Sequence, residues 1–259
     1  MIGYVGVPGA LVELPYRGGL STSADRPVSF ARTLGGKRKA FVGARSRREW
    51  SVSFDPIGSR DVAGLLAVAQ SAGPVMWYPA DAVAGNLLSP QASGFEVAPA
   101  NATDAGLVQL PDGTVARSVA ASGTVRVGSA HGNFEMVPVR PGMAVSVGAW
   151  GRGGLGFQGY WRDAAGAALP TFLVSSVARA GWAWREATLT PPAGAAFVEL
   201  HLFGGSQYAR PSISWGTKTQ DRPGRGAPAT VAHGLSEALT VIAQDDAYGS
   251  IDITITEVG

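Results

Sequence analysis

Basic side chains gather immediately before the first tryptophan of this 259-residue chain. The cluster consists of Lys37, Arg38, Lys39, Arg45, Arg47 and Arg48. Residues 1–48 carry nine lysines and arginines against two acids, whereas residues 217–259 carry three against six. Three interpretations are open: a hairpin kept from aggregating by its charge, a contact with an acidic protein surface, or a nucleic-acid site. No interleaved aromatic residues or nucleic-acid motif accompany the cluster, which argues against the third interpretation.

Two tryptophans, Trp182 and Trp184, are the second candidate for a binding role. They are separated by one residue, so both side chains project from the same face of a strand. Exposed aromatic faces stack on sugar rings, whereas buried ones fill a core. A core role, a sugar contact and a protein interface are all open interpretations of this pair.

The residues that catalysis or metal binding needs do not form a recognisable pattern. The chain has three histidines: His131, His201 and His233. None has a second ligand at metal-like spacing. Four carboxylates of the central region are candidates for catalysis: Glu135, Asp163, Glu186 and Glu199. The sequence gives no reason to pair them as a glycosidase requires, and it contains no nucleophile elbow or phosphate loop. We therefore expect neither an enzyme nor a bound cofactor or metal.

The elements that must position these side chains are mostly predicted to be strands, and the sequence predicts only one clear helix. Residues 50–54 alternate apolar and serine side chains, which is the period of a half-buried strand. Residues 55–58 predict a turn, because they contain proline and glycine. Ser59 then predicts the N-cap of a helix that Gly-Pro at 73–74 ends. Residues 75–78 are an apolar run typical of a buried strand.

Composition favours a folded, turn-rich β protein. Hydrophobic residues make up 46% of the chain and charged residues only 15%, with 36 glycines and 17 prolines, which argues against disorder. The chain has no cysteine, which excludes disulfides and thiolate metal sites. No apolar run approaches the roughly 18 residues of a membrane span, and the first residues lack the pattern of a secretory leader. We therefore expect no membrane insertion.

The central region, residues 95–216, contains eight or nine short strand candidates separated by turn residues. Residues 143–150 and 156–162, for example, are expected to form two separate strands. This spacing predicts a two-sheet sandwich or jelly roll. Residues 79–94 and 217–228 have the polar, Pro/Gly-rich composition of linkers.

The clearest amphipathic strand lies near the end of the chain, where residues 251–255 alternate isoleucine with polar side chains. It needs a sheet to join, and residues 217–259 are too few to supply one. We therefore expect it to pair with N-terminal strands. The chain then divides into a base domain of residues 1–85 and 217–259 and an inserted sandwich of residues 86–216.

Two parts of the chain resemble known families. The N-terminal strand–helix–strand unit, together with the closing residues 248–259 (YGSIDITITEVG), resembles phage distal tail proteins, often labelled minor tail proteins in phages of actinobacteria. The middle region is similar to carbohydrate-binding-like jelly rolls of the galactose-binding kind. Four stretches carry this second resemblance: residues 86–90, 139–147, 160–166 and 193–200.

These resemblances imply a mainly β fold, in which a split barrel or sandwich base with one helix carries an inserted jelly roll. They imply a structural virion protein of the tail tip, assembled in the host cytoplasm. Its homohexameric ring would join the tail tube to the host-recognition apparatus. The implied partners are further copies of the chain, the tail tube and other tail-tip proteins, with host envelope polysaccharide as a further candidate. The alternative hypothesis is a carbohydrate- or receptor-binding module that contacts the host cell envelope.

A ring also gives the basic cluster a role. A cyclic contact above twofold is heterologous, so each subunit presents two different surfaces to its neighbours. Opposite charges on such surfaces steer association and fix register. We therefore predict that residues 37–48 meet an acidic surface, on the next subunit or on the tube ring, and not nucleic acid.

Overall fold

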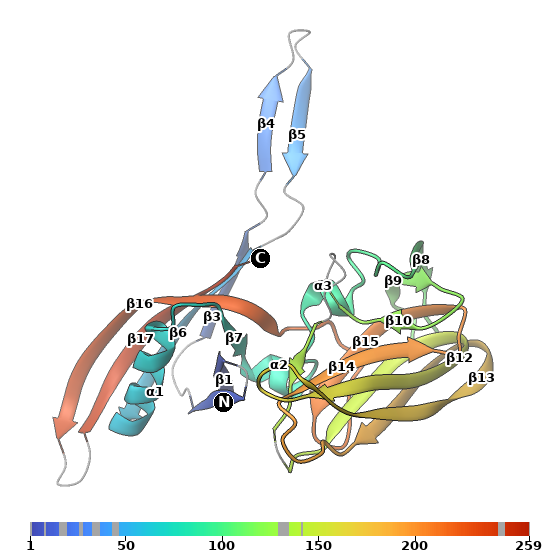
Figure 1. Cartoon of the computed structure of the whole chain (residues 1–259). Coiled ribbons are helices and arrows are strands. Elements are labelled where there is room, and N and C mark those ends of the chain that lie inside the picture. The colour runs from blue at the N-terminus through green and yellow to red at the C-terminus, as the bar shows by residue number, and fades with distance from the viewer. Residues whose placement is uncertain are drawn as a thin grey trace. The chain divides into compact units, whose positions relative to one another are not determined.

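The structure is a computed structural model of the whole chain (Figure 1). It describes residues 2–7, 9–15, 20–25, 28–32, 37–42, 47–128, 135–140, 142–242 and 247–258. The chain forms two compact units: Met1–Gly6, Val12–Trp77 and Ala229–Gly259 make up the first, and Val7–Leu11 and Tyr78–Pro228 the second. Both consist mainly of strands, which confirms the expected mainly β class. No described helix is long and apolar enough to cross a membrane.

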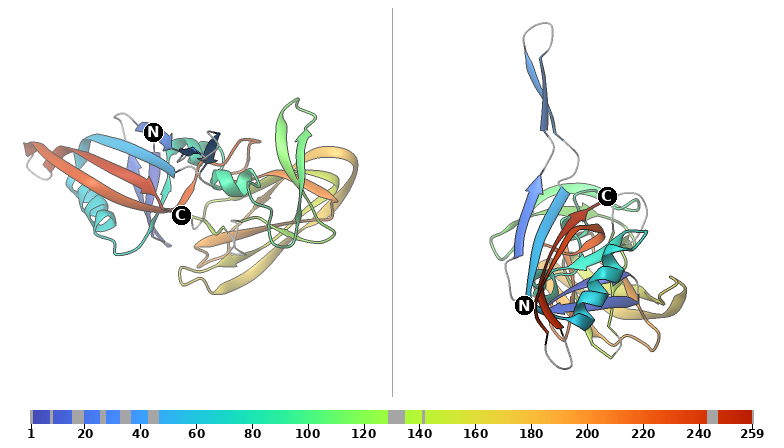
Figure 2. Two further views of the ribbon diagram at one scale, coloured as in Figure 1. Left: turned by 90° about the horizontal axis from the view of Figure 1, so that it is seen from above. Right: turned by 90° about the vertical axis from the view of Figure 1, so that its left-hand side faces the viewer.

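A seven-stranded sheet organises the first unit, with strand order β2-β1-β7-β16-β17-β6-β3. Its strands are β1 (Ile2–Val7), β2 (Ala10–Pro15), β3 (Leu20–Asp25), β6 (Arg47–Gly58), β7 (Val75–Tyr78), β16 (Ala227–Ile242) and β17 (Ala247–Glu257). Of the two strands that end the chain, drawn orange to red in Figure 2, β17 lies beside β6 and β16 lies on the other side of β17. The first and last segments of the chain therefore share one sheet.

One helix packs on this sheet. α1 (Ser59–Ala69) contacts β6 and β17. Leu65 of the helix is fully buried, and Val52 and Phe54 of β6 are no more than 1% exposed. Burial of a side chain of this size stabilises a fold by about 1.5–3 kcal/mol. The apolar stripe of α1 therefore holds the helix against the sheet.

The prediction of a turn at residues 55–58 is wrong, because β6 continues to Gly58. Between Phe54 and Ile57, β6 carries one more residue than the facing strand β17. Such a bulge accepts Pro56, since proline has no backbone N–H to contribute to the ladder. The N-cap of α1 is Gly58, one residue before the expected cap.

β17 lies between β6 and β16 and is antiparallel to both. Ile253 faces Val52 and Ile255 faces Trp50 across the β6 pairing. These side chains and Ile251 are at most 3% exposed. The prediction that the closing strand pairs with an N-terminal strand is confirmed.

Two strands of the first unit stand apart from this sheet. β4 (Val28–Arg32) and β5 (Arg38–Val42) form their own antiparallel pair, and neither pairs with another described strand. Every described side chain of the two strands is exposed, including Phe30 at 60%. A two-stranded hairpin is at best marginally stable by itself in water.

The second unit contains an eight-stranded sheet with the order β10-β14-β12-β15-β9-β8, in which β11 also pairs with β14 and β13 with β12. The strands are β8 (Thr103–Gln109), β9 (Val115–Ala120), β10 (Val125–Arg126), β11 (Val137–Pro138), β12 (Val145–Arg162), β13 (Ala168–Leu189), β14 (Phe197–Phe203) and β15 (Gln207–Trp215). The sheet curls into the sandwich-like arrangement that the strand spacing predicted.

β12 bends sharply where two separate strands were expected. Its first half pairs with β15 and its second half with β14, while β13 follows it along both halves. A Cβ on Gly151 would lie 2.6 Å from the carbonyl oxygen of Gly154, and Gly153 has φ of +82°. Glycine is required for such a close backbone approach. The glycines therefore bend one strand without ending it.

Residues 79–94, expected as a linker, are a packed part of the second unit. They contain the short helices α2 (Ala80–Ala84) and α3 (Pro90–Ser93). Leu87 and Leu88, between these helices, are fully buried.

The packing of residues 79–94 depends on hydrogen bonds of Asn86 to distant residues, which composition does not reveal. Its Nδ2 donates to the carbonyl oxygens of Pro211 and Arg222 at 3.1 and 3.0 Å. Its Oδ1 accepts from the backbone N–H groups of Leu88 and Ile213, both at 3.1 Å. Three of these four partners lie more than 120 residues away along the chain, and one of them is in the second expected linker. The second unit therefore includes residues 217–228.

Candidate functional site

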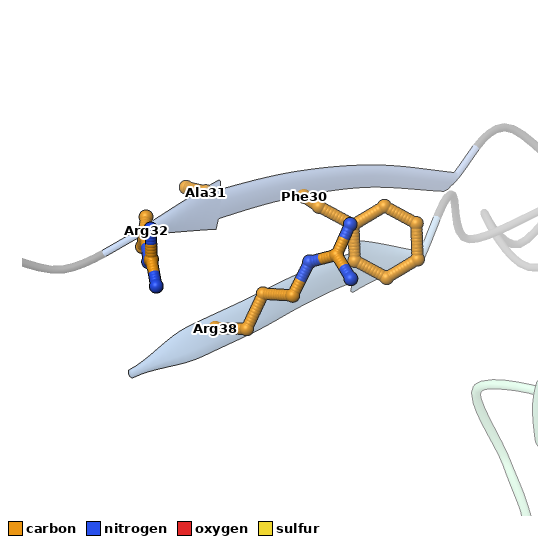
Figure 3. A pocket seen from close by; sticks show the side chains of 4 residues that line it. All are labelled: Phe30, Ala31, Arg32 and Arg38. Atoms are coloured by element: carbon orange, nitrogen blue, oxygen red, sulfur yellow. The ribbon is translucent and has the colours of Figure 1, made fainter. Parts of the chain in front are cut away.

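The basic hairpin, defined here as β4 and β5 with Lys37, carries the first candidate site (Figure 3). The guanidinium carbon of Arg38 lies 4.9 Å from the centroid of the Phe30 ring, which is a cation–π contact. Figure 3 shows Arg38 reaching across the two strands to Phe30, with Ala31 and Arg32 further along β4. These four side chains line a hollow of about 460 Å³.

Positive charge is concentrated along this hairpin. Arg32 and Arg38 occupy directly opposite positions on the two strands. Like charges placed in this way destabilise a strand pair. Lys37 and Lys39 are exposed as well. An acidic surface that binds here would offset the repulsion and cover Phe30.

Arg47 of the basic cluster does not share this position. It is exposed on β6 and faces Asp25 of β3 in the strand register. Arg45 lies outside the described residues.

Arg48 differs most from the expectation of a free interface residue, because it is only 7% exposed. Its Nε and Nη2 donate to the two carboxylate oxygens of Glu257 at 2.9 and 2.8 Å. Its guanidinium carbon also lies 4.9 Å from the centroid of the Trp50 ring. The alternation of β6 could have predicted this burial. Arg48, Trp50 and Val52 follow one another at intervals of two residues, so they project to the same, core-facing side of the strand.

The polar face of the seven-stranded sheet, which we call the outer sheet face, was not predicted from the sequence. Its members are Ser21, Ser23, Arg47, Glu49, Ser51, Ser53, His233, Asp252, Thr254 and Thr256. All are exposed or half-buried, and directly opposite residues of antiparallel strands project to the same side. Asp252 accepts a hydrogen bond from Ser53 at 2.5 Å, and Glu49 accepts one from Thr256 at 3.3 Å. The face thus presents two carboxylates, the guanidinium group of Arg47 and the imidazole of His233 among hydroxyl groups.

Trp182 and Trp184 lie together on β13 and pack against the same core cluster: Leu110, Ala116, Trp150 and Ala209. Both indoles are half-buried. Trp184 meets Trp150 edge to face, with ring centroids 6.0 Å apart. A hollow of about 70 Å³ at the bend of β12 is lined by Trp184 but not by Trp182. The two tryptophans therefore share a core contact, and Trp184 also borders open space.

Two of the candidate carboxylates are buried and engaged inside the second unit. Glu199, at 1% exposure, accepts from Nε and Nη2 of Arg162 at 2.9 and 2.8 Å. Its other oxygen lies 2.9 Å from Nε2 of His201. Glu135, at 5% exposure, accepts from the backbone N–H and the hydroxyl of Ser89 at 2.6 and 2.5 Å. Both carboxylates tie elements of the unit together.

The other candidates for catalysis or metal binding are dispersed. Asp163 accepts from the backbone N–H groups of Ala165 and Ala167 within a turn, and Glu186 is exposed. His233 is exposed, and His131 lies outside the described residues. Within the part of the chain that the structure describes, no group of three or more His, Cys, Asp or Glu side chains could hold a metal ion.

No protein-family model matches the chain, and no curated protein matches it. Among solved structures, a similar chain is the enzymatically active domain of Bacteriophage CBA120 tailspike protein 4. The match has 12% sequence identity and a TM-score of 0.35, and it covers 50% of this chain and 21% of that chain. The chain thus spans about a fifth of that structure's length, and a similarity this low assigns neither fold nor function.

Proposed function

We propose that this chain is a structural subunit of a phage tail tip, of the distal-tail kind, that assembles into a ring with copies of itself through its basic hairpin. One observation carries the proposal. β4 and β5 pair with no other described strand, and their described side chains are all exposed. Two strands alone bury too little apolar surface to be stable. A hairpin of this kind needs a partner surface, and assembly supplies one.

The construction of the first unit supports the same proposal. Its N-terminal strands and the closing strand, which carry the resemblance to distal tail proteins, lie in one sheet. In the proposed ring this unit forms the base, and the ring joins the tail tube to other tail-tip proteins in the virion. The role is structural and requires no cofactor, no catalytic group and no nucleic acid.

The outer sheet face offers a surface for the basic hairpin of a neighbouring copy. Glu49 and Asp252 are exposed there, among serine and threonine hydroxyls. Arg38 and Lys39 of the hairpin have the opposite charge, and guanidinium groups form strong hydrogen bonds to carboxylates. A hairpin that docks on this face makes a heterologous contact, which is the kind that closes a ring.

Charge reversal in the hairpin tests the proposal. The double variant Arg38→Glu/Lys39→Glu changes exposed residues outside the core, so we expect its monomer to stay folded by circular dichroism. We expect wild-type rings in sedimentation and negative-stain electron microscopy, and monomers for the variant. Wild-type assembly should also weaken as salt rises, because exposed charges are screened over about 10 Å at 0.1 M.

The matched control places the same charge change on the second unit. Arg126 and Lys218 are exposed there, and Arg126→Glu/Lys218→Glu should assemble as the wild type does. Rings of equal stability in the hairpin variant would contradict the proposed contact. A wild-type protein that stays monomeric at every salt concentration would contradict assembly through copies of this chain. Tight, salt-sensitive DNA binding would support the nucleic-acid alternative.

A carbohydrate- or receptor-binding role is the second candidate, and it belongs to the second unit. The half-buried indoles of Trp182 and Trp184 favour it, because a partly exposed aromatic ring is what a sugar ring can stack on. This role is compatible with assembly, since it uses different residues.

A further inference from the structure

We propose that His233 makes the contact between the basic hairpin and the outer sheet face sensitive to pH, so that rings dissociate more readily as the solution becomes acidic. The inference rests on the proposed ring contact and adds its regulation. It starts from a chain of hydrogen bonds on the outer sheet face. This chain joins His233 of β16 to Glu49 of β6 through Thr256 of β17.

The strand register brings these three side chains together. β17 lies between β16 and β6, and Thr256 faces Glu49 directly. His233 faces Thr254, which lies two residues from Thr256 on the same side of β17. Diagonal neighbours of this kind are about 7–8 Å apart, which is within reach of an aromatic side chain. The sheet itself therefore places the imidazole beside Thr256.

The direction of the hydrogen bonds assigns a proton to Nε2 of His233. Oγ1 of Thr256 donates to Oε2 of Glu49 at 3.3 Å. A hydroxyl has one proton to donate, so the same Oγ1 accepts from Nε2 of His233 at 2.8 Å. Neutral imidazole carries one proton, which leaves Nδ1 to take up a second. Protonation of His233 thus adds a positive charge without breaking the chain.

A charged His233 would provide Glu49 with a counter-charge inside the same subunit. The two side chains both bond to the hydroxyl of Thr256, so the imidazolium and the carboxylate would be separated by one hydroxyl group. A cation from a neighbouring copy then gains less from this carboxylate. The added charge also repels Arg38 and Lys39 of the docking hairpin. Both effects weaken the contact.

The other charged members of the outer sheet face keep their charge over the same pH range. They are Arg47 and Glu49 of β6 and Asp252 of β17, and Asp25 of β3 faces Arg47 in the register. Carboxylates change charge near pH 4 and arginines above about pH 12. β7, the second neighbour of β16, contains no charged residue. Among the described residues of this face, His233 is therefore the one whose type titrates between about pH 5 and 8.

The test compares assembly of the full chain at about pH 7.5 and about pH 5.5, at a constant ionic strength. The measured quantity is the concentration at which half of the protein is assembled, from analytical ultracentrifugation. We expect this concentration to be about fivefold higher at the lower pH, because a like charge within about 4 Å of a cation in water changes affinity by about this factor.

Two variants assign the effect to His233. His233→Gln keeps an amide donor for Thr256 and stays neutral, so it should assemble equally well at both pH values. His233→Lys is charged at both, so at the higher pH it should assemble only as well as the wild type does at the lower pH. Both variants change an exposed residue, and we expect both monomers to stay folded by circular dichroism.

A second measurement follows the protons themselves. A contact that disfavours the charged imidazole releases protons when it forms and takes them up when it breaks. Calorimetric dilution of wild-type rings at about pH 6.5, in two buffers of different ionisation enthalpy, should therefore show proton uptake. The same dilution of His233→Gln should show none from this face.

The matched control is Arg126→His, which places a new histidine at an exposed position of the second unit and should leave the pH response unchanged. Equal assembly of the wild type at both pH values would overturn the inference, as would a full pH response in His233→Gln. A wild-type protein that is monomeric at both pH values would contradict the ring contact and the inference together, so the two failures are distinguishable.

Discussion

The ion pair between Arg48 and Glu257 joins residues 209 positions apart, and its removal should unfold the first unit preferentially. The side chains are 9% and 16% exposed. Removing one partner of a buried pair costs about 3–5 kcal/mol, because the other charge is left uncompensated. Solvent reaches this pair in part, so we expect Glu257→Gln to lower the free energy of unfolding by about 2–3 kcal/mol.

Urea titration with pulsed hydrogen exchange can assign that loss to the correct unit. Peptides from residues 47–58 report on the first unit, and peptides from β12 report on the second. We expect the urea midpoint of the first set to fall while that of the second set stays constant. Glu49→Gln is the matched control, because Glu49 is an exposed carboxylate on β6, the strand of Arg48. Its effect should stay within about 0.5 kcal/mol.

A double-mutant cycle tests whether the loss of stability comes from the uncompensated charge of Arg48. Arg48→Met combined with Glu257→Gln removes the uncompensated charge, so the double variant should be at least about 1 kcal/mol more stable than the sum of the single effects. Additivity within about 0.5 kcal/mol, or a Glu257→Gln variant as stable as the wild type, would refute the role of this pair.

Three further predictions concern the second unit. Gly148→Ala should destabilise it by about 1–3 kcal/mol in thermal unfolding, because a Cβ there lies 2.5 Å from a tryptophan ring; Gly181→Ala, with nothing within 4 Å, should have little effect. Glu199→Gln should cost about 3–5 kcal/mol in urea, because its arginine partner loses its counter-charge, whereas exposed Glu186→Gln should be neutral. Burial, and then a nearby carboxylate, raise the pKa of Tyr78 well above 10. The unfolded chain therefore loses this proton first, and stability should fall as pH rises above 10. The ultraviolet phenolate signal of Tyr78, obtained by difference from Tyr78→Phe, should appear only together with unfolding.

Sequence periodicity predicted the local elements well where one face is buried. The helix beginning near residue 59, the strand at 75–78 and the alternating strand at 251–255 are all present. In each case the signal is contained in neighbouring residues, since burial on one face imposes a period of 3.6 or 2 on the sequence.

Features that depend on distant residues could not be predicted in this way. Composition assigned residues 79–94 to a linker, because nothing near Asn86 indicates that its amide binds two segments far along the chain. The expected break between residues 150 and 156 is a bend within one strand, and only the neighbouring strands distinguish a bend from an end.

The position of the inserted unit between β7 and β16 has an evolutionary consequence. These two strands are neighbours in the seven-stranded sheet, and Thr230 of β16 donates its hydroxyl proton to the carbonyl oxygen of Val75 of β7 at 2.8 Å. Neighbouring strands lie about 5 Å apart, so the chain leaves the sheet and returns to it at almost the same place. Any domain whose own ends lie close together could occupy this position without a change in strand order. Recombination could then exchange the segment between β7 and β16 between lineages while the seven-stranded sheet, with the inter-subunit contacts that we propose for it, is inherited unchanged.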